Sequence, residues 1–477
     1  ALAIIEDNYV DGNKLDYNVV TKSSIYGMLR TLDPHSNYFD RKDFDEMRTD
    51  ERSEYFGIGA AINNYTKAEN NFDTYVTATF QNSPAARAGI QYGDKIVEVD
   101  GIPMNKRPSA DVRDRIRGPR GTMVKVKLER ARTGAIETIE LTRDAVAQPS
   151  IPDVYMVAPD VGYIAMTVGF NYTTADELQA ALEKLHAQGA QSIILDLRNN
   201  GGGFLDQAIR VADKFLERGQ LILTQRGRIH TNDQEYRAQN GAPDKTPLVV
   251  LINGFTASAS EIVVGALQDH DRALLVGENS FGKGLVQTII PLEYGSGLTL
   301  TSAKYYTPSG RLIQRDYSGG LYDYLTQGRR QTPDEANPTS VQPRTSGTES
   351  HTDGGRVVYS GGGITPDVAV KARTSDANLP VNVVQAKMLS PLFFFARDLS
   401  YGRVKGFENY KIDKPIDFNH ELKSADFVVT GDLYKSFKNF ISRDLSTLEI
   451  PEAQLDRNRE FIERQLRYNM VMASYGT

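Results

Sequence analysis

The spacing of hydrophobic positions changes along the chain and divides it into regions of different character. The first region carries them at helical intervals, as at Tyr26, Leu29 and Leu32, and the turn Asp33-Pro34-His35-Ser36 ends that run. Short β-rich runs follow, and after them buried strands alternate with amphipathic helices. The regions predicted from this pattern are a helical region at 1–51, a compact β module at 52–145, an α/β core at 146–375 and a second helical region at 376–477.

The α/β core is predicted from two apolar runs that each lead into a helix. Ser192–Leu197 and Leu248–Ile252 are typical of buried strands, and helical spacing follows over Gly202–Arg218 and Ala257–Gln268. Such alternation is typical of a mostly parallel sheet with helices packed on it. Only two apolar residues occur in Thr326–Gly355, so this stretch is predicted to be a surface loop or an insertion.

Composition narrows the range of functions. The 477 residues carry 55 Lys and Arg against 61 Asp and Glu, and this net charge of −6 argues against a broadly basic nucleic-acid binder. There is no Cys, so disulfides, thiolate catalysis and cysteine metal sites are excluded. The six His residues lie too far apart for an HExxH metal motif, and neither a metal nor another cofactor is predicted.

A run of small and hydroxyl residues follows the second apolar strand and opens a helix. In Thr256-Ala257-Ser258-Ala259-Ser260-Glu261, a hydroxyl at the start of the helix faces backbone N–H groups that can bind an oxyanion. The competing interpretation is a helix cap, because Ser258 with Glu261 three residues later forms a capping box. The segment taken alone favours the cap.

A serine nucleophile needs a base. His270 and Asp269 lie at the far end of the same helix, roughly 18 Å away at 1.5 Å per residue, so neither can serve Ser258. A triad through another His has no local support, which leaves a lysine base as the other option. Lys283 stands between two glycines, and Gln287 shares its face of the next strand and can orient its amine.

A lysine acts as a base only when it is neutral, and this requires burial and no adjacent carboxylate. The run Ser280–Ile290 contains no acidic residue, which meets the second condition locally. The competing interpretation is an ordinary surface lysine in a turn.

A glycine-rich loop leaves the first apolar strand. In Asp196–Gly203, three consecutive glycines present bare N–H groups at the carboxyl edge of the sheet, which suits an oxyanion hole. A phosphate loop is the competing interpretation, but no GxxxxGK[ST] follows and no GxGxxG is complete. Simple turn chemistry also accounts for the glycines.

Together these three elements resemble the carboxyl-terminal processing peptidases, or tail-specific proteases, which are serine peptidases with a Ser–Lys dyad and an inserted PDZ domain. The resemblance covers about residues 20–370. Its motifs are Thr256–Glu261, Phe281-Gly282-Lys283-Gly284 with Gln287, Asp196–Gly203, Leu32–Ser36 and Gly361–Asp367. It implies a multidomain α/β fold with a crotonase/ClpP-like protease core, an inserted β-rich PDZ domain, and helical N- and C-terminal regions.

The resemblance also implies roles for single residues. Ser258 is expected to be the nucleophile, since the family's spacing of 25 residues to Lys283 selects it over Thr256 and Ser260. Lys283 is then the general base and Gln287 its orienting residue. Backbone N–H groups of Gly202 and Ala259 are expected to form the oxyanion hole. Gly201 departs from the family, which often has proline there.

The module at 52–145 resembles the PDZ domain. Its expected carboxylate-binding loop consists of Phe56, Gly57, Ile58, Gly59 and Ala60, whose N–H groups would cup the carboxylate of a substrate tail. Residues 105–132 hold ten Lys or Arg against three acids, which suits an anionic partner, although a solvated face is the commoner explanation. Arg117 occupies a position where some relatives couple the PDZ domain to the dyad.

The expected function is therefore a serine endopeptidase that captures protein or peptide substrates by their free C-termini and cleaves upstream. A catalytically silent PDZ scaffold is the alternative from another class, and the presence of Ser258, Lys283 and Gln287 disfavours it. A crotonase-like acyl-CoA enzyme is disfavoured by the PDZ-like insert and the Ser–Lys spacing.

The expected location is the cell envelope, in the periplasm. No apolar run reaches the roughly 18 residues of a membrane span. The chain begins at Ala1 without Met or signal peptide, which predicts a trimmed or mature form. Membrane association through a removed leader or anchor, and oligomerisation, both stay open.

Overall fold

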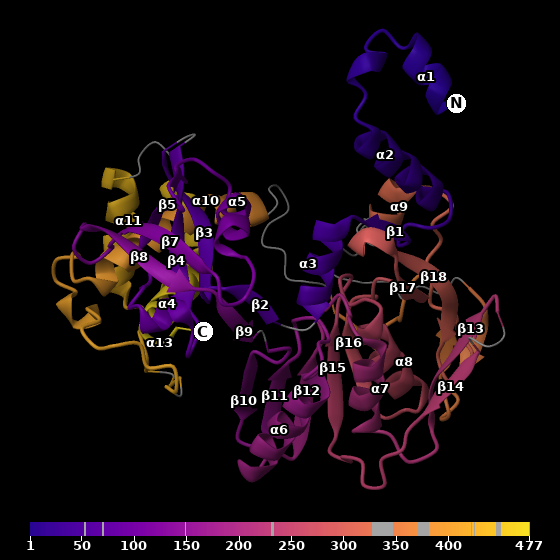
Figure 1. Ribbon diagram of the computed structural model, residues 1–477. Coiled ribbons are helices and arrows are strands. Elements are labelled where there is room, and N and C mark those ends of the chain that lie inside the picture. Colours follow the sequence, from indigo (N-terminus) through magenta and orange to yellow (C-terminus); the bar gives the residue numbers. More distant parts are fainter. Residues whose placement is uncertain are drawn as a thin grey trace. The chain divides into compact units, whose positions relative to one another are not determined.

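The computed structural model describes residues 1–51, 54–68, 71–147, 149–229, 233–326, 347–370, 381–420, 422–423, 425–444 and 450–476. The chain forms two compact units, and their elements are drawn in Figure 1. Unit 1 combines Ala1–Ser53 with Gln148–Ala372, and unit 2 combines Glu54–Ala147 with Arg373–Thr477. Each unit is therefore built from two segments that are far apart in sequence.

Unit 1 is built around a mostly parallel sheet. Its strands are β10 (Asp153–Ala158), β11 (Val161–Ala165), β12 (Ser192–Asp196), β15 (Leu248–Ile252), β16 (Leu274–Gly277) and β21 (Val368–Ala369). They lie in the order β10-β11-β12-β15-β16-β21, and only the pair β10–β11 is antiparallel among these described strands. The central strands are continuous apolar runs because both faces of a parallel sheet are covered.

Three helices pack on this sheet: α6 (Thr174–Ala187), α7 (Leu205–Asp213) and α8 (Ala259–Asp269). Their apolar side chains form one buried cluster with those of the strands, as Leu178, Ala208 and Val263 do with Leu195 and Val250. The predicted α/β core is thus confirmed. Helices α7 and α8 begin later than their sequence pattern indicates, because non-helical backbone precedes both of them.

A second sheet in unit 1 is antiparallel. Its strands are β1 (Asn37–Phe39), β13 (Leu221–Gly227), β14 (Gln234–Arg237), β17 (Leu285–Pro291) and β18 (Gly297–Tyr306). Strand β18 pairs with β1, β13 and β17, so it joins the N-terminal region to the hairpin that follows Lys283. The region predicted to be helical at 1–51 therefore contributes a strand as well. Its other elements are α1 (Leu2–Asn8), η1 (Gly12–Lys14), α2 (Tyr17–Arg30) and α3 (Arg41–Glu51).

The surface loop predicted at 326–355 falls mostly outside the described residues. Its last part is an exception, because Glu349–His351 (β19) pairs with Val357–Tyr359 (β20). The remaining short helical elements of unit 1 are η3 (Glu293–Gly295) and α9 (Leu321–Thr326).

Unit 2 contains the β module. One sheet has the order β3-β4-β5-β7-β8, with β6 paired to β5, and β2 pairs with β9. The strands are β2 (Glu54–Gly57), β3 (Ala60–Ala68), β4 (Asn71–Thr79), β5 (Lys95–Val99), β6 (Ile102–Pro103), β7 (Met123–Glu129), β8 (Ile136–Thr142) and β9 (Asp144–Ala147). Two helices belong to the module, α4 (Pro84–Arg87) and α5 (Ser109–Ile116). Its core includes Ile58, Val76, Ile96 and Val112.

The C-terminal helices pack on this β module, as Figure 1 shows by their orange and yellow colours. They are α10 (Val381–Ser400), η4 (Glu408–Tyr410), α11 (Gly431–Asp444), α12 (Glu452–Arg457) and α13 (Arg459–Tyr475). The ring of Phe393 in α10 stacks on Tyr65 of β3 at 3.8 Å, and Tyr92 donates a hydrogen bond to Asn469 of α13. In the described ranges, no helix combines the length and apolar character that a membrane crossing requires.

Candidate active site

Three loops meet at the carboxyl edge of the parallel sheet in unit 1. They follow β12, β15 and β16, which are adjacent strands. Backbone hydrogen bonds join the loops, from Ala257 N to the Asn200 carbonyl (3.0 Å) and from Phe281 N to the Thr256 carbonyl (2.8 Å). This edge is where sites form in α/β sheets. The fold therefore brings together the three motifs singled out in the sequence.

Ser258 lies at the turn between β15 and α8 in a strained backbone conformation. Its φ is 57° and its ψ is −118°, which residues other than glycine rarely adopt. The Ser258 N–H donates to Oε2 of Glu261 at 2.9 Å, so part of the predicted capping box is present. Ser258 also lines a cavity of about 1220 Å³. Strain of this kind clusters at active sites, and here it coincides with a hydroxyl on a cavity wall.

The neighbouring hydroxyls of the same motif are buried and already bonded. Thr256 donates to the carbonyl of Leu197 at 2.8 Å, and Ser260 donates to the carbonyl of Asn200 at 3.1 Å. Both residues are 0% exposed and neither lines the cavity. Of the three hydroxyl residues in this motif, Ser258 is the one that a substrate in the cavity can reach.

Glu261 is a fully buried carboxylate that joins the Ser258 turn to the Lys283 loop. Besides the Ser258 N–H, it accepts hydrogen bonds from Ser280 Oγ (2.5 Å), Gly282 N (2.7 Å) and Lys283 N (2.8 Å). Burial raises the pKa of the Glu261 carboxyl, and these donors oppose the rise. Glu261 thereby fixes the distance between the two loops that carry the predicted dyad.

Lys283 lies on the wall of the same cavity. Burial lowers the pKa of its amine below 10.5, while the charges of Glu261 and Asp33 work in the opposite direction. The expectation of surroundings without a carboxylate is therefore wrong, because the fold brings in two acids from distant segments. The direction of the shift still favours the neutral amine that a general base requires. Among the described residues, Lys283 Nζ forms no hydrogen bond or ion pair.

Gln287 lies on β17 and lines the cavity with Lys283, although a register shift between Val286 and Gln287 interrupts the alternation of the strand. Its amide Nε2 donates to Thr301 Oγ1 of β18 at 3.2 Å, and the two residues are register partners. No hydrogen bond joins Gln287 to Lys283 within the described residues. Its orienting role stays a prediction.

Tyr305 is a site residue that the sequence did not reveal. Its buried hydroxyl lies 3.0 Å from the carbonyl oxygen of Ser258 and 2.7 Å from that of Lys283. Burial raises the pKa of the Tyr305 phenol well above its ordinary value of 10, so the hydroxyl keeps its proton. Tyr305 thereby links the Ser258 turn and the Lys283 loop through their carbonyl oxygens.

The glycine-rich loop packs directly against Ser258. Gly202 has a φ of 95°, and a Cβ there would lie 2.8 Å from both the Ser258 Cβ and the Ala259 N, so only glycine fits. Its N–H donates to Asn200 Oδ1 at 2.9 Å, and the Asn200 amide in turn holds the carbonyls of Met166 and Val168. The Ala259 N–H donates to no acceptor in the described part of the chain.

The predicted carboxylate loop lies in unit 2 and connects β2 to β3. Gly59 has a φ of 71° and packs on Ser83, where a Cβ would clash at 2.2 Å. Within the described residues, the N–H groups of Ile58 and Gly59 donate to no acceptor, as a carboxylate-binding loop requires. Arg117 follows α5, and Gly118 N donates to the Phe56 carbonyl at 3.2 Å. The structure thus places Arg117 beside this loop.

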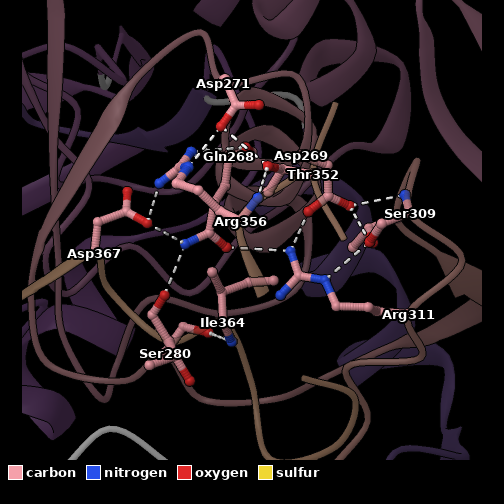
Figure 2. A network of polar contacts seen from close by, with 12 residues as sticks. Gln268, Asp269, Asp271, Ser280, Ser309, Arg311, Thr352, Arg356, Ile364 and Asp367 are labelled. Atoms are coloured by element: carbon pink, nitrogen blue, oxygen red, sulfur yellow. Dashed lines mark hydrogen bonds and ion pairs between the residues drawn. The ribbon is translucent and has the colours of Figure 1, made fainter. Parts of the chain in front are cut away.

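A polar network holds the opposite end of α8 (Figure 2). Arg311 pairs with Asp269, and Ser309 donates to the same carboxylate from its N–H (2.9 Å) and its hydroxyl (2.7 Å). Arg356 bridges Asp271 and Asp367. This network attaches the segment Gly361–Asp367, which the sequence singled out, to the helix that starts after Ser258.

Comparison with known proteins identifies both units. The model of peptidase family S41 matches residues 160–323, and the PDZ domain model matches residues 75–130. The carboxy-terminal-processing protease of Bartonella bacilliformis is 40% identical over 304 residues, which are 63% of this chain and 68% of that protein. The carboxy-terminal processing protease CtpA of Bacillus subtilis is 35% identical over 308 residues, 63% of each chain. The solved structure of a photosystem II D1 C-terminal processing protease matches with 28% identity and a TM-score of 0.41, covering 76% of this chain and 84% of its own.

Proposed function

Because this chain belongs to the S41 carboxyl-terminal processing proteases and is a serine peptidase with a PDZ domain, we propose that Ser258 is its nucleophile and Lys283 its general base. The supporting geometry is that both residues line one cavity. Ser258 stands on a strained turn, and burial favours the neutral amine of Lys283. Gln287, on the same cavity wall, is proposed to orient that amine.

In this mechanism neutral Lys283 takes the Ser258 hydroxyl proton while Oγ bonds to the scissile carbonyl carbon. The lysine ammonium then gives that proton to the leaving amine as the C–N bond breaks, and the acyl group remains on Ser258 as an ester. Water next attacks the ester while Lys283 accepts its proton. Return of this proton to Ser258 Oγ releases the product and restores the neutral amine.

The developing oxyanion needs N–H donors beside Ser258. The Ala259 N–H is proposed as the first donor, since it has no acceptor in the described residues and begins α8. Gly202 is proposed as the second donor, and its N–H must first leave Asn200 Oδ1, to which it donates in this structure. Substrate binding therefore has to rearrange the glycine-rich loop slightly.

One observation carries the assignment of the nucleophile: Ser258 lines the cavity, whereas Thr256 and Ser260 are buried and bonded to carbonyls. The test is incubation of a substrate with a disordered apolar tail, followed by mass spectrometry of the products. Wild type should cleave the substrate, and Ser258→Ala should not. Ser260→Ala is the matched control and should retain cleavage and labelling by a fluorophosphonate. Loss of label in Ser260→Ala with label retained in Ser258→Ala would contradict the assignment.

The PDZ domain is proposed to read a free C-terminal carboxylate through Phe56–Ala60. Support comes from the Ile58 and Gly59 N–H groups, which have no acceptor in the described residues, and from Arg117 beside the loop. Amidation of the C-terminus of a peptide substrate should weaken its binding about ten- to a hundredfold, because one charge-assisted hydrogen bond contributes an affinity factor of this size. Equal cleavage of free-acid and amidated peptides below saturation would show that the loop has another role.

Three further proposals rest on the sequence alone: an envelope location, membrane association and oligomerisation. Cell fractionation of the native protein, with release by detergent compared with release by salt, tests the first two. Light scattering of the purified protein over a range of concentrations tests the third.

A further inference from the structure

The N-terminal segment reaches the predicted active site through β18. The carboxylate of Asp33 is buried and accepts hydrogen bonds from the N–H groups of His35 (2.7 Å) and Ser36 (2.8 Å). The hydroxyl of Ser36 donates to the same carboxylate at 2.6 Å and accepts from the Thr301 N–H at 3.1 Å. The turn after α2 is therefore anchored at Thr301, which is the register partner of Gln287.

Thr301 lies between the Asp33 turn and Gln287. Its hydroxyl helps to lower the pKa of the Asp33 carboxyl, and its Oγ1 accepts from Gln287 Nε2 at 3.2 Å. A hydroxyl has one proton to donate, and an ionised carboxylate can only accept. When the Thr301 hydroxyl turns its proton toward Asp33, its oxygen is left to accept from Gln287.

This polarity decides which way the Gln287 amide faces. Because Thr301 Oγ1 accepts from Gln287 Nε2, Gln287 presents its NH₂ to Thr301 and not its carbonyl oxygen. The Oε1 atom then remains as an acceptor, and no described residue donates to it. An ammonium has three donors and no acceptor, so only this orientation lets Gln287 receive a hydrogen bond from protonated Lys283.

We propose that Asp33 and Thr301 are positioning residues of the peptidase site, which fix the orientation of the Gln287 amide so that its Oε1 faces the lysine base. This inference rests on the proposed Ser258–Lys283 dyad and extends it to the N-terminal segment. It also gives a physical role to the turn Asp33-Pro34-His35-Ser36, which the sequence analysis linked to the family without a function.

The ionisation of Asp33 is consistent with this role. Burial alone would raise the pKa of its carboxyl, but hydrogen bonds from Ser36, His35 and Thr301 bring it below the ordinary value of 3.8. The other titratable groups whose charges act around Lys283 are Glu261 from α8 and His35 from the same turn. Burial lowers the pKa of His35 to about 4, so it is neutral near pH 7 and leaves the two carboxylates as the charges facing the lysine.

The first test compares Thr301→Val with Thr301→Ser. Valine keeps the shape of threonine and removes the hydroxyl, whereas serine keeps the hydroxyl and serves as the matched control. We expect kcat to fall about ten- to a hundredfold in Thr301→Val, with little change in KM, because misplacement of a catalytic group by about 1 Å can cost a hundredfold. Thr301→Ser should stay within about threefold of wild type.

The second test is the pH dependence of kcat in Asp33→Asn. Asparagine still accepts from the His35 and Ser36 N–H groups, but it removes a charge that raises the pKa of Lys283. Besides losing rate, this variant should shift the acid limb of the profile to lower pH, which a merely structural defect would not do. Thermal unfolding and circular dichroism report the amount of folded enzyme.

The outcomes separate the two proposals. Full kcat in folded Thr301→Val, or an unshifted profile in folded Asp33→Asn, would overturn the positioning role while leaving the dyad intact. Activity near wild type in Lys283→Ala would overturn the dyad itself. Parallel losses of kcat and folded fraction, without a pH shift, would assign Asp33 and Thr301 to folding and contradict the inference.

Discussion

The two ends of α8 hold buried carboxylates in different ways. At the N-terminal end, Glu261 has no cationic salt-bridge partner among the described residues and accepts from one hydroxyl and three backbone N–H groups. At the C-terminal end, Asp269 pairs with Arg311, and both side chains are only 1% exposed. Both acids are fully bonded, but only Asp269 uses a second charge.

The difference matches the chemistry at each end. A buried arginine beside Glu261 would place a permanent positive charge next to Lys283, where it would disfavour the ammonium that forms when the base takes a proton. Backbone N–H groups satisfy Glu261 and also fix the loops that carry Ser258 and Lys283. The polar network at the C-terminal end of α8, around Asp269, Arg311 and Arg356, is called the rear network. It contains no proposed catalytic residue, so ion pairs can cross-link distant segments there (Figure 2). The N-terminal end of α8 with Ser258, Glu261 and Lys283 is called the front. Substitutions at the front should therefore lower the rate, and substitutions at the rear should lower the stability.

The largest effect is expected on stability, at the rear. Arg311→Met leaves Asp269 buried without its cation, which should lower the free energy of unfolding by about 3–5 kcal/mol. The double variant Asp269→Leu/Arg311→Met should recover most of the loss, because it removes both charges. Urea unfolding measures the stability, and kcat of the folded fraction should stay within about twofold of wild type. A large fall in kcat at full stability would show that the rear network takes part in catalysis.

A smaller effect is expected at the front, and it should appear in the rate. Glu261→Gln offers one acceptor oxygen and an NH₂ group to a site that supplies only donors, so the NH₂ must face an N–H or a hydroxyl. The Ser258 turn and the Lys283 loop should separate, and kcat should fall about a hundredfold. Asp269→Asn is the matched control, because it neutralises a buried acid of the same helix. Wild-type kcat in folded Glu261→Gln would reduce Glu261 to a helix cap.

The positions of Ser258 and Lys283 at the front could be predicted from the sequence, because both residues lie close to the ends of strands. Ser258 and Lys283 each follow an apolar strand, and parallel neighbours bring their carboxyl ends to one edge. Glu261 was recognised only as a cap, since its bonds to Gly282 and Lys283 cross 21 and 22 residues. The same distance explains why the surroundings of Lys283 were wrongly expected to lack a carboxylate.

Other contacts join segments that are far apart in the sequence, and no local pattern predicts them. Asp33 reaches the site because β1 pairs with β18, a contact between residues more than 250 positions apart. The C-terminal helices pack on the β module through Phe393 and Phe394, and this apolar run was the available signal. The sequence predicted a helical region at 376–477 but not which sheet its helices cover.

The third prediction concerns pH. Because burial lowers the pKa of Lys283, kcat should rise with pH as the amine loses its proton, with a midpoint below 10.5. Removing the charge of Glu261 should lower that midpoint further, whereas Asp269→Asn at the rear should leave it unchanged. Lys283→Arg should be inactive at every pH, since guanidinium does not deprotonate in proteins. Equal midpoints in Glu261→Gln and Asp269→Asn would contradict the electrostatic difference between the two ends.

The smallest effect is expected from His35, whose ring is influenced by the charge of Lys283. It should appear in the free energy of unfolding and not in the rate. Burial first, and then the charge of Lys283, lower the pKa of His35 from 6.5 to about 4. Between these values the unfolded chain binds a proton that the folded protein does not, so acidification from pH 6.5 to pH 4 should reduce the free energy of unfolding. His35→Gln can still bond to the Tyr324 hydroxyl, which His35 Nε2 contacts at 2.6 Å, and it removes this titration. The stability difference between wild type and His35→Gln, measured by urea unfolding, should therefore be constant above pH 6.5 and shift in favour of the variant below it. A difference that stays constant down to pH 4 would mean that His35 titrates normally and that the front of the site is more open to water than its burial indicates.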